Sequence, residues 1–357
     1  MPSCLRKVDT MPNFIKNSSI KMQRWLERQW YSDQLGVWYF LLMPLDLLMR
    51  LLVLLRQFFY KAGILFSWRS PIPVIVVGNI TVGGTGKTPL VIWLVEMLKA
   101  KGYKPGIVSR GYGGSVRGVA SVSVDADPML VGDEPLLMAK QSACPVWIGK
   151  DRPAAAKALI EAHPECDVII SDDGLQHYAL QRDMEIVVVD GVRLYGNKAM
   201  LPIGPMREPL RRLMHVDAVV VNGGKRDGAA GEYSMRLCGE YFYALHSPEK
   251  QVKADHFKYK PVHAVAGIGN PARFFNQLRE LGLNIIEHAF SDHHQFQPAD
   301  LQIQGAEAIL MTEKDAVKCL QFSQDNIWVL PVQVKEVSGL EDKVIQKIES
   351  FYGRKTA

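Results

Sequence analysis

The sequence is poor in cysteine, and its five cysteines form no recognisable pattern. Cys4, Cys144, Cys166, Cys238 and Cys319 are far apart and include no CxxC pair. An odd number of widely spaced cysteines predicts neither a disulfide framework nor a zinc site. This pattern favours a reducing compartment.

The chain also lacks a strong excess of charge of either sign. Its 42 Lys and Arg residues against 37 Asp and Glu residues give a formal net charge of +5. Because basic and acidic residues are nearly equal in number, the charge does not indicate a nucleic-acid-binding protein. We predict neither a nucleic-acid partner nor a protein partner. The first residues contain no short apolar core followed by a small-residue cleavage site, so we expect no secretory signal.

The most apolar stretch, residues 38–66, has no uninterrupted apolar run of the roughly 18 residues expected of a simple spanning helix. Charged residues interrupt it at Asp46, Arg50, Arg56 and Lys61. On a helical wheel all of these except Arg56 lie, together with Gln57, within about 60° of one another. The pattern therefore predicts a helix with one narrow polar face.

Aromatic residues flank this helix at Trp38, Tyr39, Tyr60 and Trp68. Such residues are typical of the headgroup level of a membrane, so we favour a helix that lies in the membrane interface. The alternatives are an amphipathic helix packed on the protein's own core and a spanning helix.

From residue 71 onward, short β-branched runs alternate with helical stretches, which predicts parallel sheets with helical crossovers. The length of 357 residues favours two domains. The predicted fold is α/β: a P-loop NTPase-type parallel sheet with helices on both faces, a second smaller α/β domain, and the N-terminal membrane-associating helix. The expected division is a polar, basic segment 1–37, the apolar helix 38–70, a P-loop domain 71–222, a connector with a possible β-ribbon 223–260, and a C-terminal α/β domain 261–357.

A glycine-rich stretch, GNITVGGTGKTP at residues 78–89, follows the apolar run PVIVV. A strand, a tight glycine turn and a helix N-terminus are the parts that bind nucleotide phosphates through free backbone N–H groups. Lys87 would place its charge near the β- and γ-phosphates, and Thr88 would place its hydroxyl on Mg²⁺. Thr81 stands where such loops open with a glycine, and adjacent Gly83 and Gly84 could supply the tight turn instead. The residues expected to bind nucleotide are Thr81, Val82, Gly83, Gly84, Thr85, Gly86, Lys87 and Thr88.

Two acidic residues end the apolar run CDVIISDD. Asp172 and Asp173 would emerge at the carboxyl end of a strand, where ligands of α/β sheets bind and where Mg²⁺ needs oxygen ligands. The alternative is an ordinary Asp-Asp-Gly turn. We therefore expect Thr88, Asp172 and Asp173 to form a Mg²⁺ site.

Several polar clusters occur in a fixed order with the glycine-rich loop: SRGYGG (109–114), GDEP (132–135), DDGLQH (172–177), PIGPMREP (202–209), SDHH (291–294) and MTEKDAVK (311–318). Together with the apolar helix, they closely resemble the tetraacyldisaccharide 4'-kinase family of lipid A biosynthesis. The resemblance extends from about residue 22 to the end of the chain. It implies a two-domain P-loop kinase that uses ATP and Mg²⁺ to phosphorylate the 4'-hydroxyl of a tetraacylated disaccharide 1-phosphate. It also implies a peripheral location on the cytoplasmic face of the inner membrane, with the lipid substrate and the membrane surface as partners.

The resemblance also implies roles for particular residues. Asp133 would accept the hydroxyl proton and pair with His293 across the cleft between the domains, with His294 as the second choice. Other active-site candidates are Arg110, Gln176, His177, Arg207 and Glu208. From the residues alone, Asp133 would instead be a helix cap, His293 a surface loop residue, and Arg207 and Glu208 a surface ion pair.

The main alternative function is a membrane-associated P-loop GTPase or assembly factor. A guanine-reading motif has the form Asn/Thr-Lys-x-Asp, and Thr312-Glu313-Lys314-Asp315 has those letters in the wrong register. A third alternative is a protein that binds nucleotide without chemistry.

Overall fold

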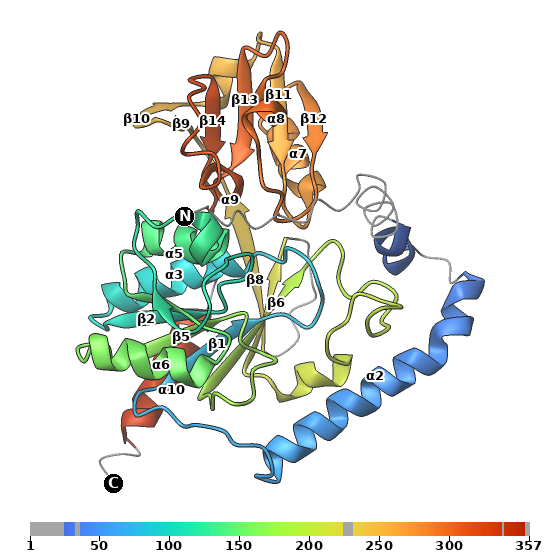
Figure 1. Cartoon of the computed structure of the whole chain (residues 1–357), viewed down its shortest axis with the longest axis vertical. Coiled ribbons are helices and arrows are strands. Elements are labelled where there is room, and N and C mark those ends of the chain that lie inside the picture. Colours follow the sequence, from blue (N-terminus) through green and yellow to red (C-terminus); the bar gives the residue numbers. More distant parts are fainter. Residues whose placement is uncertain (1–24, 33–35, 224–230, 338, 354–357) are drawn as a thin grey trace, which may run out of the picture.

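The computed structural model describes residues 25–32, 36–223, 231–337 and 339–353. They form a larger and a smaller α/β lobe, with one long helix beside the larger lobe (Figure 1). Most of the segment 1–37, including the residues before Met22, lies outside this described part.

The larger lobe is built on a nine-stranded sheet in the order β15-β8-β7-β6-β1-β5-β2-β4-β3. All neighbouring pairs are parallel except the two at the edges, β15 with β8 and β3 with β4. The strands are β1 (Val74–Gly78), β2 (Pro105–Ser109), β3 (Ala120–Ser121), β4 (Val146–Ile148), β5 (Val168–Asp172), β6 (Met184–Asp190), β7 (Ala218–Asn222), β8 (Glu232–Cys238) and β15 (Gln333–Glu336).

Helices cover both faces of this sheet. They are α3 (Lys87–Ala100), α4 (Pro128–Val131), α5 (Asp133–Ser142), α6 (Arg152–Ala162) and α10 (Leu340–Gly353), with a 3₁₀ helix η1 (Leu210–His215). Alternate residues of β1 point to opposite faces, so that Ile75 packs in the core with α3, α5 and α10, whereas Val76 packs with α6 on the other side. Burial on both faces explains why the central strands are continuous apolar runs.

The smaller lobe has a six-stranded sheet in the order β10-β9-β14-β13-β11-β12. Its elements are β9 (Phe242–Ala244), β10 (Ser247–Val252), η2 (Ala254–Phe257), β11 (Val262–Ala266), α7 (Pro271–Glu280), β12 (Ile285–Ala289), α8 (Pro298–Leu301), β13 (Ala308–Thr312), α9 (Glu313–Ala316) and β14 (Ile327–Leu330). The four strands β14, β13, β11 and β12 are parallel. The predicted fold class, a large parallel sheet with a second α/β unit and an N-terminal apolar helix, is thus present.

The course of the chain differs from the expected domain boundaries in two ways. The range 261–357 does not stay in one lobe, because β15 pairs with β8 and α10 packs in the core of the larger lobe through Leu340, Val344 and Ile348. Within the predicted connector 223–260, β8 belongs to the larger sheet, whereas β9 and β10 pair as an antiparallel ribbon in the smaller sheet, so the connector is divided between the two lobes. Both differences have one cause: the chain crosses between the lobes twice, and β8 finds its antiparallel partner about a hundred residues later. We propose a division in which residues 333–353 belong to the larger lobe.

The apolar segment forms α2 (Val37–Lys61), and its narrow polar face contacts the larger lobe. Asp46 accepts a hydrogen bond of 2.5 Å from Met200 N, and Gln57 donates to Tyr178 Oη and Glu208 Oε2. Arg50 is bound to Asp46 and to Lys198 O, and the Arg56 guanidinium lies over the Tyr60 and Tyr178 rings.

The apolar face of α2 points away from the protein. Large exposed side chains on it include Trp38, Phe40, Leu47, Leu51 and Phe58. Among the described residues, α2 is the one helix long and apolar enough to cross a membrane, and only 6% of its apolar window is buried. Length and composition therefore suit a spanning helix as well as an interfacial one, whereas this exposure disagrees with the core-packed alternative.

Candidate active site

The glycine-rich loop joins β1 to α3 at the carboxyl edge of the larger sheet. Gly86 has a φ of 95° and precedes the first residue of α3, so the helix N-terminus opens into the loop. Gly83 has a φ of 104°. A Cβ on Gly86 would lie 2.3 Å from Asn222 Nδ2, which donates to Thr85 O. Glycine is therefore required here by both conformation and space.

Thr81 is buried and forms an isolated antiparallel bridge with Met206. Val82 N donates to Pro205 O at 2.8 Å. The first part of the loop is therefore extended and bound to the segment 205–206, which explains why no glycine is needed at position 81. The turn itself begins at Gly83.

A buried hydroxyl in the loop has no hydrogen-bond partner. Thr85 is 3% exposed, and its Oγ1 is unsatisfied. An unsatisfied buried hydroxyl is costly, so its presence at a loop of free N–H groups is the feature expected of a site that binds an oxygen-rich ligand. Thr88 lies in the first turn of α3 and is also buried.

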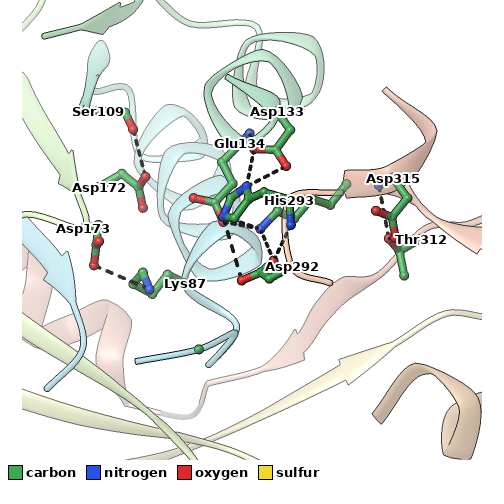
Figure 2. A network of polar contacts seen from close by, with 12 residues as sticks. Lys87, Ser109, Asp133, Glu134, Asp172, Asp173, Asp292, His293, Thr312 and Asp315 are labelled. Carbon is green, nitrogen blue, oxygen red and sulfur yellow. Dashed lines mark hydrogen bonds and ion pairs between the residues drawn. The ribbon is translucent and has the colours of Figure 1, made fainter. Parts of the chain in front are cut away.

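Asp172 and Asp173 lie where β5 ends, beside β1, and differ in their surroundings (Figure 2). Asp172 is 1% exposed; its Oδ2 accepts from Ser109 Oγ at 3.0 Å, and its Oδ1 has no partner. Burial and the nearby Glu134 and Asp173 carboxylates raise the pKa of Asp172 to about 7. A cation beside Oδ1 would relieve this unfavourable charge.

Asp173 has a left-handed backbone, with a φ of 45°. Its carboxylate lies 3.5 Å from Lys87 Nζ and 3.1 Å from Arg207 Nη1. Burial would raise the pKa of Asp173, but these two cations outweigh it and hold the pKa well below its usual range. The strand end and the glycine-rich loop are thus joined by an ion pair.

Asp133 of α5 contacts His293 of the loop after β12, so the two lobes meet at this pair (Figure 2). His293 Nδ1 lies 3.2 and 3.1 Å from the two carboxylate oxygens. Asp133 is 5% exposed and also accepts from Glu134 N. The N-cap of α5 is Gly132, so Asp133 is not the helix cap that the residues alone suggested. His294 faces the smaller lobe instead, where it binds Asp300 and packs on Phe290 and Phe296.

The remaining candidates lie around the same strand ends. Gln176 Nε2 donates to Asn79 O and to Glu208 Oε1. Glu208 is 1% exposed and also accepts from Tyr178, Arg212 and Gln57, so it does not form a surface ion pair with Arg207.

His177 and Arg110 lie near the buried Arg152. Burial and the charges of Arg152 and Arg110 lower the pKa of His177 to about 4. Arg110 is exposed at the end of β2.

Several residues of this region were not anticipated from the sequence. Arg152, 1% exposed, donates to Asp172 O at 2.8 Å and so supports the strand end. Its signal in the sequence is an arginine at the first position of α6, directly before Pro153 and three alanines. Ser109, Asn79, Asp292 and Lys314 lie within the motifs quoted above, but the sequence assigned them no role, because polar residues beside glycines and at helix starts are common in any chain.

The loop after β11 packs directly on the glycine-rich loop. Gly269 O accepts from Arg193 Nη1 at 3.0 Å, and Asp190 binds Asn270 and Arg273. A Cβ on Gly269 would lie 2.5 Å from the backbone nitrogen of Gly84. This backbone contact brings the smaller lobe against the loop.

Replacing Gly269 by Ala is therefore expected to raise the KM for ATP about 10-fold, because the added methyl prevents the smaller lobe from closing on the loop and overpacking of this kind costs 1–3 kcal/mol. Steady-state kinetics with varied ATP measures the effect. Gly353→Ala is the control, since a Cβ there meets no atom within 4 Å. An unchanged KM in Gly269→Ala would show that closure does not need this contact.

Comparison with known proteins agrees with this geometry. Residues 38–349 match the family model described as tetraacyldisaccharide-1-P 4'-kinase. Curated relatives with the name tetraacyldisaccharide 4'-kinase include one from Azoarcus sp. (strain BH72), 51% identical and covering 89% of this chain and 93% of its own length. Another, from Methylobacillus flagellatus, is 47% identical and covers 91% and 96%.

A solved structure gives the same assignment. The chain is similar to LpxK from Aquifex aeolicus, crystallised in complex with ATP, with a TM-score of 0.72 at 30% identity, over 87% of this chain and all of that one. The family match spans both lobes and α2, and therefore every residue of the cleft described above. This chain belongs to the tetraacyldisaccharide-1-P 4'-kinase family.

Proposed function

We propose that this protein transfers the γ-phosphate of ATP to the 4'-hydroxyl of a tetraacyldisaccharide 1-phosphate, giving lipid IVA in lipid A biosynthesis. Family membership supports the reaction and its lipid A disaccharide substrate. The observation that carries the proposal is the pair Asp133 and His293. A buried carboxylate with an imidazole partner lies in the same cleft as the loop that ends in Lys87.

The segment Thr81–Thr88 binds the nucleotide in this proposal. The free N–H groups at the start of α3 and the unsatisfied Thr85 Oγ1 face the phosphate oxygens. Lys87 neutralises charge on the β- and γ-phosphates. Thr81 and Val82 contribute by holding the loop through their contacts with Met206 and Pro205.

Thr88, Asp172 and Asp173 are the residues that would hold Mg²⁺. Hydroxyl and carboxylate oxygens are the donors this ion prefers, and the unsatisfied, buried Asp172 Oδ1 fits such a role. When bound, Mg²⁺ supplies positive charge to the phosphates. Asp172 is the better direct ligand of the two, because Lys87 and Arg207 already pair with the Asp173 carboxylate.

Asp133 accepts the proton of the attacking 4'-hydroxyl, and His293 orients the carboxylate. Phosphoryl transfer needs chiefly positioning, charge neutralisation and a proton acceptor. Burial would raise the pKa of Asp133, but the hydrogen bond from His293 and the charge of Lys314 outweigh it, so the carboxylate is ionised at neutral pH. Because its partners come from both lobes, the base is complete only when the cleft is closed.

The other candidates fall into two groups. Arg207 and Arg110 are placed to bind anionic groups of ATP or of the lipid. Gln176, His177 and Glu208 instead support the strand end, and Glu208 links it to α2 through Gln57.

We further propose that α2 lies on the cytoplasmic face of the inner membrane as a peripheral anchor. A lipid with four acyl chains stays in the bilayer, since each buried CH₂ contributes about 0.8 kcal/mol, so the enzyme must reach it there. The polar face of α2 is used in contacts with the larger lobe, which leaves the apolar face for the membrane. Lys61 remains near the headgroups, whereas Arg50 is bound to the protein.

Replacing Leu47 and Leu51 by Glu is expected to lower binding to vesicles of anionic phospholipid about 100-fold, because two exposed leucines would otherwise each contribute about 1.5–3 kcal/mol. Cosedimentation measures the change. Lys258→Glu, on the smaller lobe, is the surface control. Equal binding of the double variant and the wild type would argue against this anchor.

The proposal is tested by incubating the purified protein with labelled ATP and the acyl disaccharide in detergent micelles. Label on the lipid supports the kinase, whereas lipid-independent turnover of GTP would support the alternative of a membrane-associated GTPase. The geometry of Asp315 disagrees with a guanine site, since its carboxylate already accepts from Thr312 Oγ1, Gly267 N and Lys318 Nζ and is not available to a guanine base.

A further inference from the structure

Lys314, in the motif MTEKDAVK, lies at the junction of the two lobes, and the function proposed above uses only its charge, which helps to keep Asp133 ionised. It belongs to the short helix α9, and its side chain is 18% exposed. Its Nζ donates to Glu134 Oε1 of the larger lobe at 2.9 Å and to Asp292 Oδ1 at 3.3 Å. His293 Nε2 lies 3.4 Å from the same ammonium. Lys314 thus touches the ring nitrogen of His293 that Asp133 does not.

These contacts decide which nitrogen of His293 bears the proton. An ammonium group has N–H donors and no lone pair, so it can be bound only by a ring nitrogen that has one. In the neutral imidazole the lone pair is therefore at Nε2 and the N–H at Nδ1. The N–H then points at the Asp133 carboxylate, 3.1 Å away. A partner at the second ring nitrogen is how proteins commonly select a histidine tautomer.

The charge of Lys314 acts on both members of the pair. Burial would lower the pKa of His293, the hydrogen bond to Asp133 raises it above its ordinary value, and Lys314 opposes that rise. Lys314 also helps to hold the pKa of Asp133 below its ordinary value. Burial would lower the pKa of Lys314 itself, but Glu134, Asp292 and Asp133 outweigh it, so Lys314 stays charged.

The other groups around the pair do not replace this charge. Asp292, on the loop of His293 itself, is negative and raises the pKa of His293. Its Oδ2 lies 3.8 Å from His293 Nε2, beyond hydrogen-bond distance, whereas Lys314 Nζ is closer at 3.4 Å. The Tyr112 ring, from the loop after β2, packs against the imidazole with ring centroids 4.8 Å apart. Lys318 also lowers the pKa of Asp133, but its Nζ is bound to Asp315.

We propose that Lys314 is a positioning residue for the reaction. It holds His293 with Nδ1–H directed at Asp133, and its bond to Glu134 makes this arrangement depend on closure of the two lobes. This inference rests on the proposed roles of Asp133 and His293. In this inference Lys314 touches neither ATP nor the 4'-hydroxyl. It sets the tautomer of His293, which orients the base Asp133.

Lys314→Met and Lys314→Gln are expected to lower kcat about 100-fold, the effect of a small misplacement of a catalytic group. The acidic limb of the pH profile of kcat should move to higher pH, because loss of the positive charge raises the pKa of Asp133. Lys314→Arg keeps the charge, so the limb should return to its wild-type position with kcat partly restored. Lys258→Met, which removes a surface ion pair of the same lobe, should change neither.

A measurement that does not depend on activity separates this inference from the proposed function. Histidine ¹⁵N NMR of the wild type, with His293→Gln to identify the signal, should show Nδ1–H and an unprotonated Nε2 at a pH above the pKa of His293. In Lys314→Met the signal of an unprotonated Nε2 should weaken at the same pH. The ring gains a proton more readily there, because the Lys314 charge that lowers the pKa of His293 is gone. The thermal unfolding of each variant is measured as well, to detect a loss of stability.

Two results would overturn the inference. The first is a His293 tautomer and a His293 titration that are unchanged in both Lys314→Met and Lys314→Gln. The second is a fall in kcat that comes with lower thermal stability while the acidic limb of the pH profile keeps its wild-type position. A wild type with the expected His293 signals that does not phosphorylate the lipid would overturn the proposed function instead. The two failures are therefore distinguishable.

Discussion

Asp133→Asn is expected to lower kcat for 4'-phosphorylation about 1000-fold, within the range of general base catalysis, while the affinity for ATP stays close to that of the wild type. Asn has the shape of Asp and can still accept the Glu134 N–H, but it cannot take the hydroxyl proton. The side chain faces His293, and no contact ties it to the glycine-rich loop. Steady-state kinetics and calorimetric titration with ATP measure the two quantities.

The matched control is Asp125→Asn, an exposed turn residue of the same lobe, which should leave kcat unchanged. The residual activity of Asp133→Asn should also lack the acidic limb of the wild-type pH profile. That limb reflects protonation of Asp133. Its midpoint lies below the ordinary pKa of an aspartate, because His293 and Lys314 lower the pKa of Asp133 by more than burial raises it. A variant that keeps more than a tenth of the wild-type kcat would remove Asp133 as the base.

Lys87→Met is the second substitution with a large expected effect, a fall in kcat of about 100- to 1000-fold. The Lys87 side chain is 12% exposed at the start of α3, and its Nζ lies 3.5 Å from Asp173 Oδ1. Its removal leaves the transferred phosphoryl group without a fixed positive charge where charge develops, and leaves Asp173 with Arg207 as its cationic partner. Single-turnover measurements with saturating ATP separate this effect from weaker binding.

Lys101→Met, just after the other end of α3, is the control, since it removes only a surface ion pair with Glu341. Lys87→Arg should recover little activity, because a guanidinium is broader than the ammonium group that the tight loop accommodates. Full activity in Lys87→Met would mean that the loop binds phosphate through its backbone alone.

The local patterns of the sequence were sufficient to predict the helices and strands and the site residues that directly follow them in the chain. The runs before Gly78 and Asp172 are buried strands of a parallel sheet, and the glycine-rich stretch is the loop between a strand and a helix. The narrow polar face of 38–66 was also readable. Each of these depends on periodicity or backbone freedom within a few residues, which the sequence contains directly.

Tertiary structure decided which distant residues meet. The pairing of β15 with β8, which returns the C-terminal residues to the larger lobe, depends on a partner about a hundred residues away. The polar face of α2 binds the larger lobe, and Lys314 reaches Glu134 and His293, although no local pattern of the sequence predicts either contact. The reason is physical: a local pattern determines which face of a segment is polar, whereas its partner depends on how all the segments pack together.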